Sequence, residues 1–165
     1  MKQQVVCTRY KVSGHRTAGL VFSILCCLGT VLNSSCKKKD KTESTVTPQI
    51  EFVSISPASA VEYVNPITIT FSYDDLDGDL GENDPNVTNL FITDSRNNVI
   101  YNYRISELAP DGSSLHIKGN LNAVIKNTAI TDNSASQSVT YSLYVKDRAG
   151  NTSNTITTSA ITITK

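Results

Sequence analysis

From Pro48 onward, hydrophobic and polar residues alternate with a period of two, which is typical of half-buried β-strands. The clearest run extends from Ile67 to Tyr73, where four apolar or aromatic residues alternate with Thr, Thr and Ser. The polar positions are rich in Thr, a β-branched residue that suits a pleated surface. The pattern predicts strands near residues 49–55, 67–73, 87–93, 98–105, 113–119, 138–146 and 154–163.

Turn signals separate these segments, at Asn65-Pro66, Asp77-Gly78, Asn97-Asn98, Asp111-Gly112 and Gly150-Asn151. The last segment loses its alternation at Ser159-Ala160, which predicts a bulge, and residues 121–128 are the one candidate for a short helical turn. Seven short strands in residues 48–165 predict an all-β, immunoglobulin-like antiparallel β-sandwich. The alternative is a small barrel or jelly roll, because the Cys and Trp hallmarks of antibody domains do not occur in this segment.

The N-terminal segment has a different pattern. Residues 1–17 are polar and basic, and residues 18–32 form an uncharged, mostly apolar run. That run is shorter than the roughly 20 residues that a membrane-spanning helix needs, and it suits the core of a signal peptide. The following Asn33-Ser34-Ser35-Cys36 resembles the bacterial lipobox, although Asn33 stands where Leu is usual. The resemblance implies that residues 1–35 are a cleaved signal peptide and that Cys36 is lipidated; an anchor helix or plain secretion are the alternatives.

Residues 36–47 link this signal to the β-domain. From Lys37 to Thr47 the chain is polar and lacks apolar periodicity, so we expect a flexible tether. The four cysteines are Cys7, Cys26, Cys27 and Cys36, so residues 48–165 cannot form an internal disulfide.

The net charge of zero conceals a strongly acidic segment. From Thr47 onward there are 13 acidic and seven basic residues, and six of the acidic residues lie between Asp74 and Asp84. An acidic domain with no basic stripe argues against nucleic acid as a partner. The excess of acidic residues is local, so it needs a local explanation.

Carboxylates this dense repel each other unless a cation or solvent compensates them, and Ca²⁺ is the natural candidate. The spacing Asp75-x-Asp77-x-Asp79 matches the opening of an EF-hand loop. However, Leu80 and Asn86 stand where that loop requires Gly and Glu, which rejects an EF-hand. In an immunoglobulin-like order, Asp147 and Asn151 would approach this loop. The candidate metal ligands are Asp74, Asp75, Asp77, Asp79, Asp84 and Asp147; the alternative is a solvated acidic turn.

The segment Tyr73–Gly81 (YDDLDGDLG) and the later segment Val145–Asn154 (VKDRAGNTSN) carry a family resemblance. With the Ser-Ser-Cys ending, they resemble a group of uncharacterised Bacteroidota lipoproteins that have a single Ig-like domain. The resemblance covers essentially the whole chain. It implies a fold and an outer-membrane location, either displayed on the cell surface or facing the periplasm, but no activity.

Few residues in the mature chain could support catalysis. His116 is its one histidine and should point outward, and Cys36 is its one cysteine, so neither a Cys/His nucleophile nor a zinc site can be assembled. We therefore expect a non-catalytic lipoprotein that is held to the membrane by its lipid and that carries a binding or structural module with a glycan or protein ligand. The alternatives are a glycan-capture accessory protein of an uptake system, for which exposed tyrosines could form a platform, or an enzyme or enzyme inhibitor.

Overall fold

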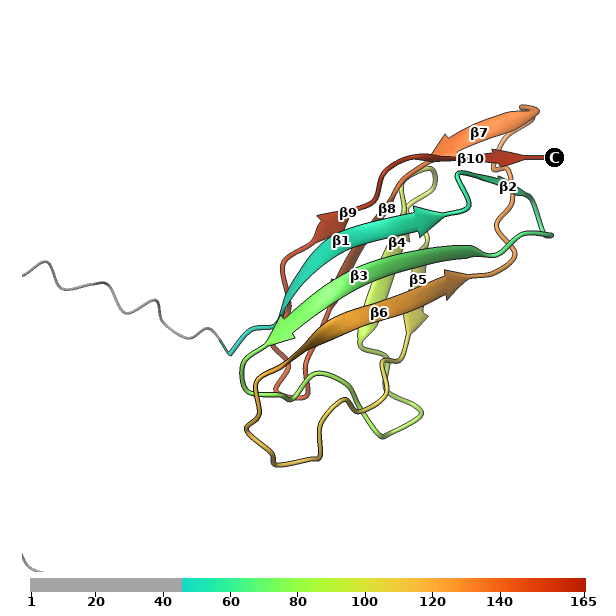
Figure 1. Ribbon diagram of the computed structural model, residues 1–165. Coiled ribbons are helices and arrows are strands. Elements are labelled where there is room, and N and C mark those ends of the chain that lie inside the picture. Colours follow the sequence, from blue (N-terminus) through green and yellow to red (C-terminus); the bar gives the residue numbers. More distant parts are fainter. Residues whose placement is uncertain (1–45) are drawn as a thin grey trace, which may run out of the picture. The chain divides into compact units, whose positions relative to one another are not determined.

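The computed structural model describes residues 46–165, which form ten β-strands and no helix (Figure 1). The expected signal peptide, Cys36 and most of the expected tether lie outside these residues. No helix long and apolar enough to cross a membrane occurs in the described part of the chain. The strands are β1 (Gln49–Ser56), β2 (Ser59–Val61), β3 (Ile67–Asp75), β4 (Leu90–Asp94), β5 (Ile100–Tyr103), β6 (Ile117–Ile125), β7 (Ser136–Val139), β8 (Tyr141–Val145), β9 (Ile156–Thr157) and β10 (Ile161–Thr164).

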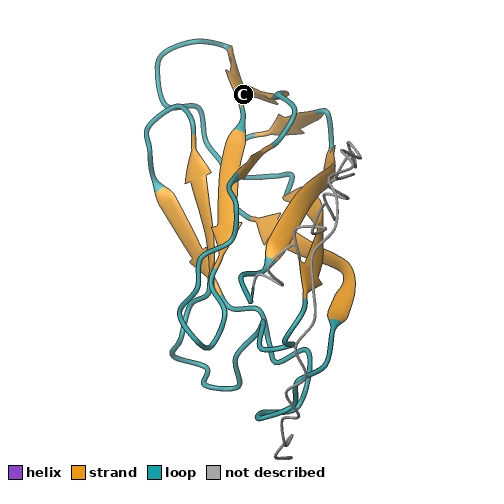
Figure 2. Cartoon of the chain, turned by 90° about the vertical axis from the view of Figure 1, so that its left-hand side faces the viewer, coloured by secondary structure: helices purple, strands orange, loops and turns teal. Residues whose placement is uncertain are grey.

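The strands form a β-sandwich (Figure 2). One sheet has the order β1-β3-β6 and the opposite sheet has the order β5-β4-β8-β9, and every pair within them is antiparallel. A third, small sheet, β2-β10-β7, includes the one parallel pair of strands, β2 with β10. This arrangement confirms the predicted all-β sandwich, and the β1-β3-β6 and β4-β8-β9 groups correspond to the A-B-E and C-F-G strands of immunoglobulin-like domains.

The alternating sequence pattern fills the core between the sheets. In β3, Ile67, Ile69 and Phe71 are fully buried, while the threonines between them are half-buried on the outer face. Tyr141 and Leu143 of β8 are fully buried on the opposite sheet. Full burial of a large apolar side chain contributes about 1.5–3 kcal/mol, so these inward rows hold the two sheets together.

The expected helical turn at residues 121–128 is wrong, because β6 continues to Ile125. Leu121, Ala123 and Ile125 lie opposite Phe71, Ile69 and Ile67 of β3 in the antiparallel ladder. A short apolar run fits a strand and a helix equally well, and here pairing with β3 decides between them.

Two predicted strands are each divided into two shorter strands, at the point where the chain leaves one partner strand and pairs with another. The predicted 138–146 strand breaks at Thr140, because β7 pairs with β10 whereas β8 pairs with β4. The predicted 154–163 strand is interrupted between β9 and β10, at the position of the expected bulge. β9 pairs with β8 and β10 with β7, so the interruption moves the chain from one sheet to another.

Candidate metal centre

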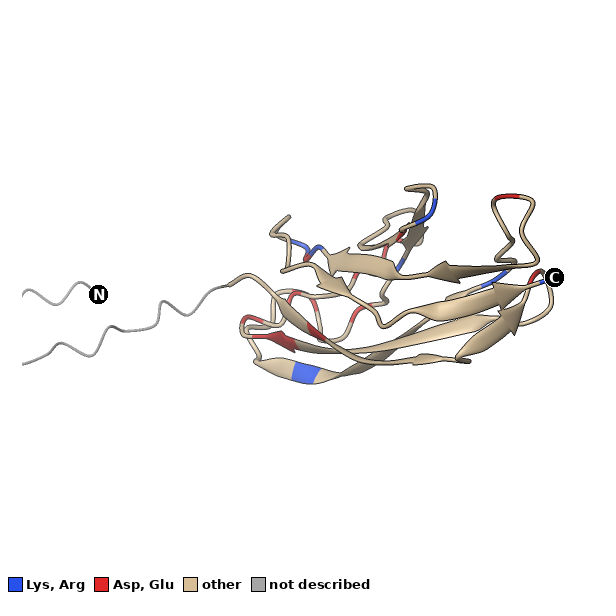
Figure 3. Ribbon diagram, turned by 90° about the horizontal axis from the view of Figure 1, so that it is seen from above, with Lys and Arg blue, Asp and Glu red and all other residues tan. Residues whose placement is uncertain are grey.

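The acidic loop begins where β3 ends, at one pole of the sandwich. Acidic residues gather at this pole, at the end where β1 begins (Figure 3). Successive side chains of a strand point to opposite faces, so Asp75 continues the inward row of Phe71 whereas Asp74 points outward. Asp75 is accordingly 0% exposed, which is rare for a carboxylate without a cationic partner.

Three carboxylates converge inside this pole. Asp75, Asp77 and Asp79 each place an oxygen within 4.8 Å of the other two. One oxygen of Asp75 accepts a hydrogen bond from the backbone amide of Leu80 at 2.8 Å, and one of Asp79 accepts from the amide of Ala149 at 3.1 Å. The Oδ1 atoms of all three aspartates are buried and have no hydrogen-bond partner. Buried polar atoms are normally paired, so three unpaired acceptors in one place form a ready donor set for a cation.

The electrostatics of the three carboxylates show the cost of holding them together. Burial raises the pKa of Asp75 to about 6, and the negative charges of the neighbouring Asp77 and Asp79 add to that rise. Burial also raises the pKa of Asp79, and the charge of Asp147 is the next largest cause. Both shifts favour the neutral acids, so ionising the cluster without a compensating charge is unfavourable.

Close backbone contacts fix the path of the acidic loop. Gly78 has φ of 75°, and a Cβ placed on it would lie 2.1 Å from the carbonyl oxygen of Leu115. The Arg148 side chain donates hydrogen bonds to the carbonyl oxygens of Gly81 at 3.2 Å and Gly78 at 3.4 Å. The backbone amide of Arg148 also donates to the carbonyl oxygen of Asp79 at 3.2 Å. The acidic loop is therefore held by the turn that follows β8.

The substitution Gly78→Ala tests this close packing, and Gly112→Ala is its matched control. Gly112 has a similar φ of 73°, but a Cβ there would have nothing within 4 Å. Both variants incur the strain of a left-handed alanine, about 1 kcal/mol. Only Gly78→Ala also forces a backbone clash, so we expect it to lower the free energy of unfolding by about 2 kcal/mol more than the control. Urea denaturation measures both; equal losses would contradict the close packing of this loop.

The other candidate ligands differ in their positions. Asp147 is buried next to the cluster, and its carboxylate accepts hydrogen bonds from the backbone and side chain of Asn151 at 2.7 and 2.9 Å. The structure thus brings the 147–151 turn to the acidic loop, as the expected strand order implied. Asp74 instead lies on the outer face, 2.7 Å from His116, and Asp84 accepts hydrogen bonds from Asn86 in an exposed turn. Neither joins the three clustered aspartates.

Arg148 also belongs to this pole, although it was not among the expected site residues. Its guanidinium lies 3.4 Å from Asp111 and 3.9 Å from Glu107, in addition to its two bonds to the acidic loop. One side chain therefore links three loops at this pole. One feature of the sequence could have indicated this role of Arg148. It is a basic residue in the turn that the expected strand order places beside the acidic loop.

The chain was also compared with known proteins. No protein-family model matches it, and no curated protein matches it. Its role is therefore inferred from the residues of the pole and of the sandwich surface.

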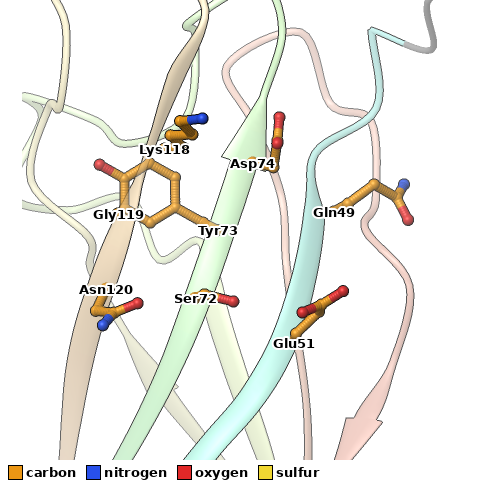
Figure 4. Close-up of a pocket in the computed structure, with 8 residues that line it drawn as sticks. All are labelled: Gln49, Glu51, Ser72, Tyr73, Asp74, Lys118, Gly119 and Asn120. Carbon is orange, nitrogen blue, oxygen red and sulfur yellow. The ribbon is translucent and has the colours of Figure 1, made fainter.

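A second feature is a groove of about 370 Å³ on the outer face of the β1-β3-β6 sheet (Figure 4). Its side chains are mostly polar and carry both signs of charge: Gln49, Glu51, Ser72, Tyr73, Asp74, Lys118 and Asn120, with Gly119 between the last two. Most tyrosines are packed rather than displayed. Tyr141 is fully buried, and Tyr73, Tyr101 and Tyr103 pack against the core. A broad platform of exposed tyrosines is therefore not formed by the described residues.

The stability of the metal-free domain should depend on pH through Asp75. Its pKa of about 6 lies above the value of about 4 expected in the unfolded chain, so folding favours its protonated form. That contribution is complete below about pH 4 and is lost as the pH rises through 6. We expect the free energy of unfolding of metal-free wild type, relative to Asp75→Asn, to fall between pH 4 and 7. Chemical denaturation of both proteins at several pH values measures it; a constant difference would contradict the burial of this carboxylate.

Proposed function

We propose that the domain binds one Ca²⁺ through Asp75, Asp77 and Asp79 and that the bound ion stabilises the loops at this pole. The observation that carries the proposal is twofold: each of the three aspartates places a carboxylate oxygen within 4.8 Å of the other two, and each has a buried Oδ1 atom with no hydrogen-bond partner. A divalent cation supplies the positive charge that the three ionised groups lack, and it removes the cost that raises the pKa of Asp75 and Asp79.

The chemistry of the cluster favours Ca²⁺ over other metals. All three side chains offer oxygen, and no histidine or cysteine belongs to the group. Oxygen ligands suit Mg²⁺, Ca²⁺ and Mn²⁺, whereas thiolate and imidazole ligands select zinc and copper. Mg²⁺ demands near-ideal octahedral geometry, while Ca²⁺ accepts six to eight ligands in an irregular loop. Three carboxylates at alternate positions, from the last residue of β3 into the loop that follows, therefore fit Ca²⁺ best, with water or loop carbonyls completing its shell.

The position of the cluster supports a stabilising role. Asp79 already contacts the turn after β8 through Ala149 and Arg148, so an ion held by Asp79 would brace that turn as well. The acidic loop and this turn follow strands of opposite sheets, β3 and β8. A Ca²⁺ ion at this point would therefore fasten the two sheets together at one end.

We further propose that the chain is a non-catalytic outer-membrane lipoprotein of the Bacteroidota type, held to the membrane by lipid on Cys36. The apolar run 18–32, the small residues before Cys36 and the polar tether after it support the anchor. His116, the histidine of the described residues, is engaged with Asp74 at the surface. This arrangement suits a binding or structural module that extends from the membrane on its tether. Its partners are then a protein or a glycan rather than nucleic acid.

Thermal unfolding of the soluble chain from Lys37 to Lys165 tests the calcium proposal. Every strand and the whole core lie within Gln49–Thr164, so this chain contains the complete sandwich. At a hundredfold excess over Kd, Ca²⁺ should add about 2.7 kcal/mol, which corresponds to a rise in Tm of roughly 10 °C. Mg²⁺ serves as the control and should raise Tm much less. An unchanged Tm at millimolar Ca²⁺, compared with EGTA, would contradict the proposal.

The groove in Figure 4 favours glycan capture as a second candidate function. Carboxylate, amide and hydroxyl groups such as Glu51, Asn120 and Ser72 are the partners that sugar hydroxyls use. The groove lies on the outer face of a sheet, whereas the aspartate cluster lies inside the pole, so the two functions are compatible. A glycan array probed with the soluble chain tests this second function separately from calcium binding, because glycan binding in this groove would not require Ca²⁺.

A further inference from the structure

Strand β6 forms an open edge of the sandwich. It pairs with β3 on one side, and no other described strand pairs with it. β5 is likewise the edge strand of the opposite sheet. Figure 1 shows β6 as the outermost strand of its sheet. An unpaired strand edge presents a row of free backbone amides and carbonyls, which is a template for pairing with another chain.

An apolar cleft runs along this open edge. It has a volume of about 530 Å³ and lies between β6 and the segment from Tyr103 to Leu108. Its apolar walls are Phe71, Leu90, Ile105, Leu108, Leu121 and Ala123, several of which belong to the buried core. The cleft therefore opens from the strand edge directly onto the interior of the sandwich. Apolar side chains of a strand paired with β6 would enter it.

The direction of the free backbone groups follows from one hydrogen bond. The Tyr103 hydroxyl donates to the carbonyl oxygen of Val124 at 3.1 Å, so this carbonyl points away from β3. Along an antiparallel strand, the backbone amide and carbonyl groups of successive residues point alternately toward and away from the paired strand. The pairing of β6 with β3 from Ile117 to Ile125 has no shift in register, so this alternation is unbroken. Asn122 therefore also directs its amide and carbonyl groups toward the cleft side. Pairing at Val124 would replace the bond from Tyr103.

The charges at the cleft indicate the chemistry of the occupant. Arg104 and Lys126 are the charged residues of its lining. Lys118 lies near the other end of β6, outside the cleft. Residues 117–126 include no acidic residue, although the domain as a whole is acidic. Pairing of β6 with β6 of a second copy would bring these lysines together, which is unfavourable. An extended segment that carries acidic residues is complementary to the edge.

We propose that β6 and this cleft bind an extended peptide segment of a partner protein by strand addition. The segment pairs with the backbone of Asn122 and Val124, where it displaces the Tyr103 hydroxyl from the Val124 carbonyl. It places alternate apolar side chains in the cleft and acidic residues near Lys126 and Arg104. Backbone pairing supplies affinity in this mode, and the cleft selects the side chains. The site is separate from the aspartate cluster, so it does not depend on Ca²⁺.

The test uses a nine-residue peptide in which valine and threonine alternate between terminal aspartates, added to the isotope-labelled soluble chain. We expect the peptide to slow hydrogen exchange of the Asn122 and Val124 amides and to shift their NMR signals. The same peptide with a central proline, which removes one backbone donor and disrupts the strand, should bind at least about tenfold more weakly. Unchanged Asn122 and Val124 signals at millimolar peptide would overturn the proposal. Shifts of Leu121 and Ala123 methyl groups without amide protection would also overturn it, because they would indicate a small apolar ligand only.

Three variants test the contacts one at a time. Lys126→Glu should weaken binding about fivefold, while Lys118→Glu, the same charge change on β6 outside the cleft, should have a much smaller effect. Tyr103→Phe should strengthen binding about threefold, because the Val124 carbonyl is then free to pair with the peptide. If the Tyr103 hydroxyl only stabilises the fold, Tyr103→Phe would lower the stability of the domain without strengthening peptide binding. Equal effects of the two lysine variants, or weaker binding by Tyr103→Phe, would contradict the proposed site.

Discussion

Asp75→Asn should stabilise the metal-free domain and abolish its response to Ca²⁺. At neutral pH the Asp75 carboxylate is ionised, fully buried and close to two other carboxylates. Asparagine keeps the shape and retains an oxygen that can accept from the Leu80 amide, but it carries no charge. We therefore expect the free energy of unfolding of the metal-free protein to rise by roughly 1 to 2 kcal/mol. Denaturation in EGTA measures this gain.

The same variant should lose the stabilisation by Ca²⁺. The ion would have one carboxylate fewer and a neutral oxygen in its place, which weakens a hard-cation site sharply. Asp74→Asn is the matched control, because Asp74 is the neighbouring residue of β3 but lies on the outer face beside His116. The control should keep the full rise in Tm with Ca²⁺. A loss of the response in both variants would point to a diffuse effect of charge, and a retained response in Asp75→Asn would exclude Asp75 as a ligand.

Cys36→Ser should release the protein from the membrane or block its maturation. A diacylglyceryl group on the Cys36 thiol carries two acyl chains, which give stable anchoring, and serine cannot receive it, so the change should be close to complete. Fractionation of cells that express the full chain, with detection of the protein in membrane and soluble fractions, measures the outcome.

Cys27→Ser provides the control for the anchor. This cysteine lies in the apolar run, upstream of the expected cleavage point, and its replacement should leave fractionation unchanged. If Cys36→Ser stayed in the membrane fraction to the same extent as the wild type, the anchor would have to be the apolar run itself.

The sequence was most informative where one face of a strand is buried. The run from Ile67 to Tyr73 predicted β3 closely, because a strand with one core face must alternate. It was least informative at Leu121–Ile125, where a short apolar run fits either a helix or a strand. Only the long-range pairing of β6 with β3 decides that case, and such pairing has no local signature.

The candidate site was predictable in composition but not in detail. The repeated Asp-x-Asp spacing marked the acidic loop, and the expected strand order brought Asp147 near it. The separation of Asp74 from Asp75 follows from the alternation of the strand, since β3 continues through both residues. The bracing of the loop by Arg148 and the close contact of Gly78 with Leu115 could not be predicted, because both depend on how three loops meet.

The open edge of β6 is also a property of the three-dimensional arrangement. The sequence of β6 contains lysine and asparagine residues but nothing that marks it as an edge strand. Its position becomes evident once the sheet order β1-β3-β6 is known. The proposed peptide site thus depends on sheet order, whereas the proposed calcium site depends on local spacing.

Calorimetric titration of the metal-free soluble chain with Ca²⁺ tests the central claim most directly. The three buried, unpaired carboxylate oxygens of Asp75, Asp77 and Asp79 predict saturable binding of one Ca²⁺ per chain. The heat signal should disappear in Asp75→Asn and persist in Asp74→Asn. No saturable heat at millimolar Ca²⁺, or an equal signal from Asp75→Asn, would show that the acidic pole is not a calcium site.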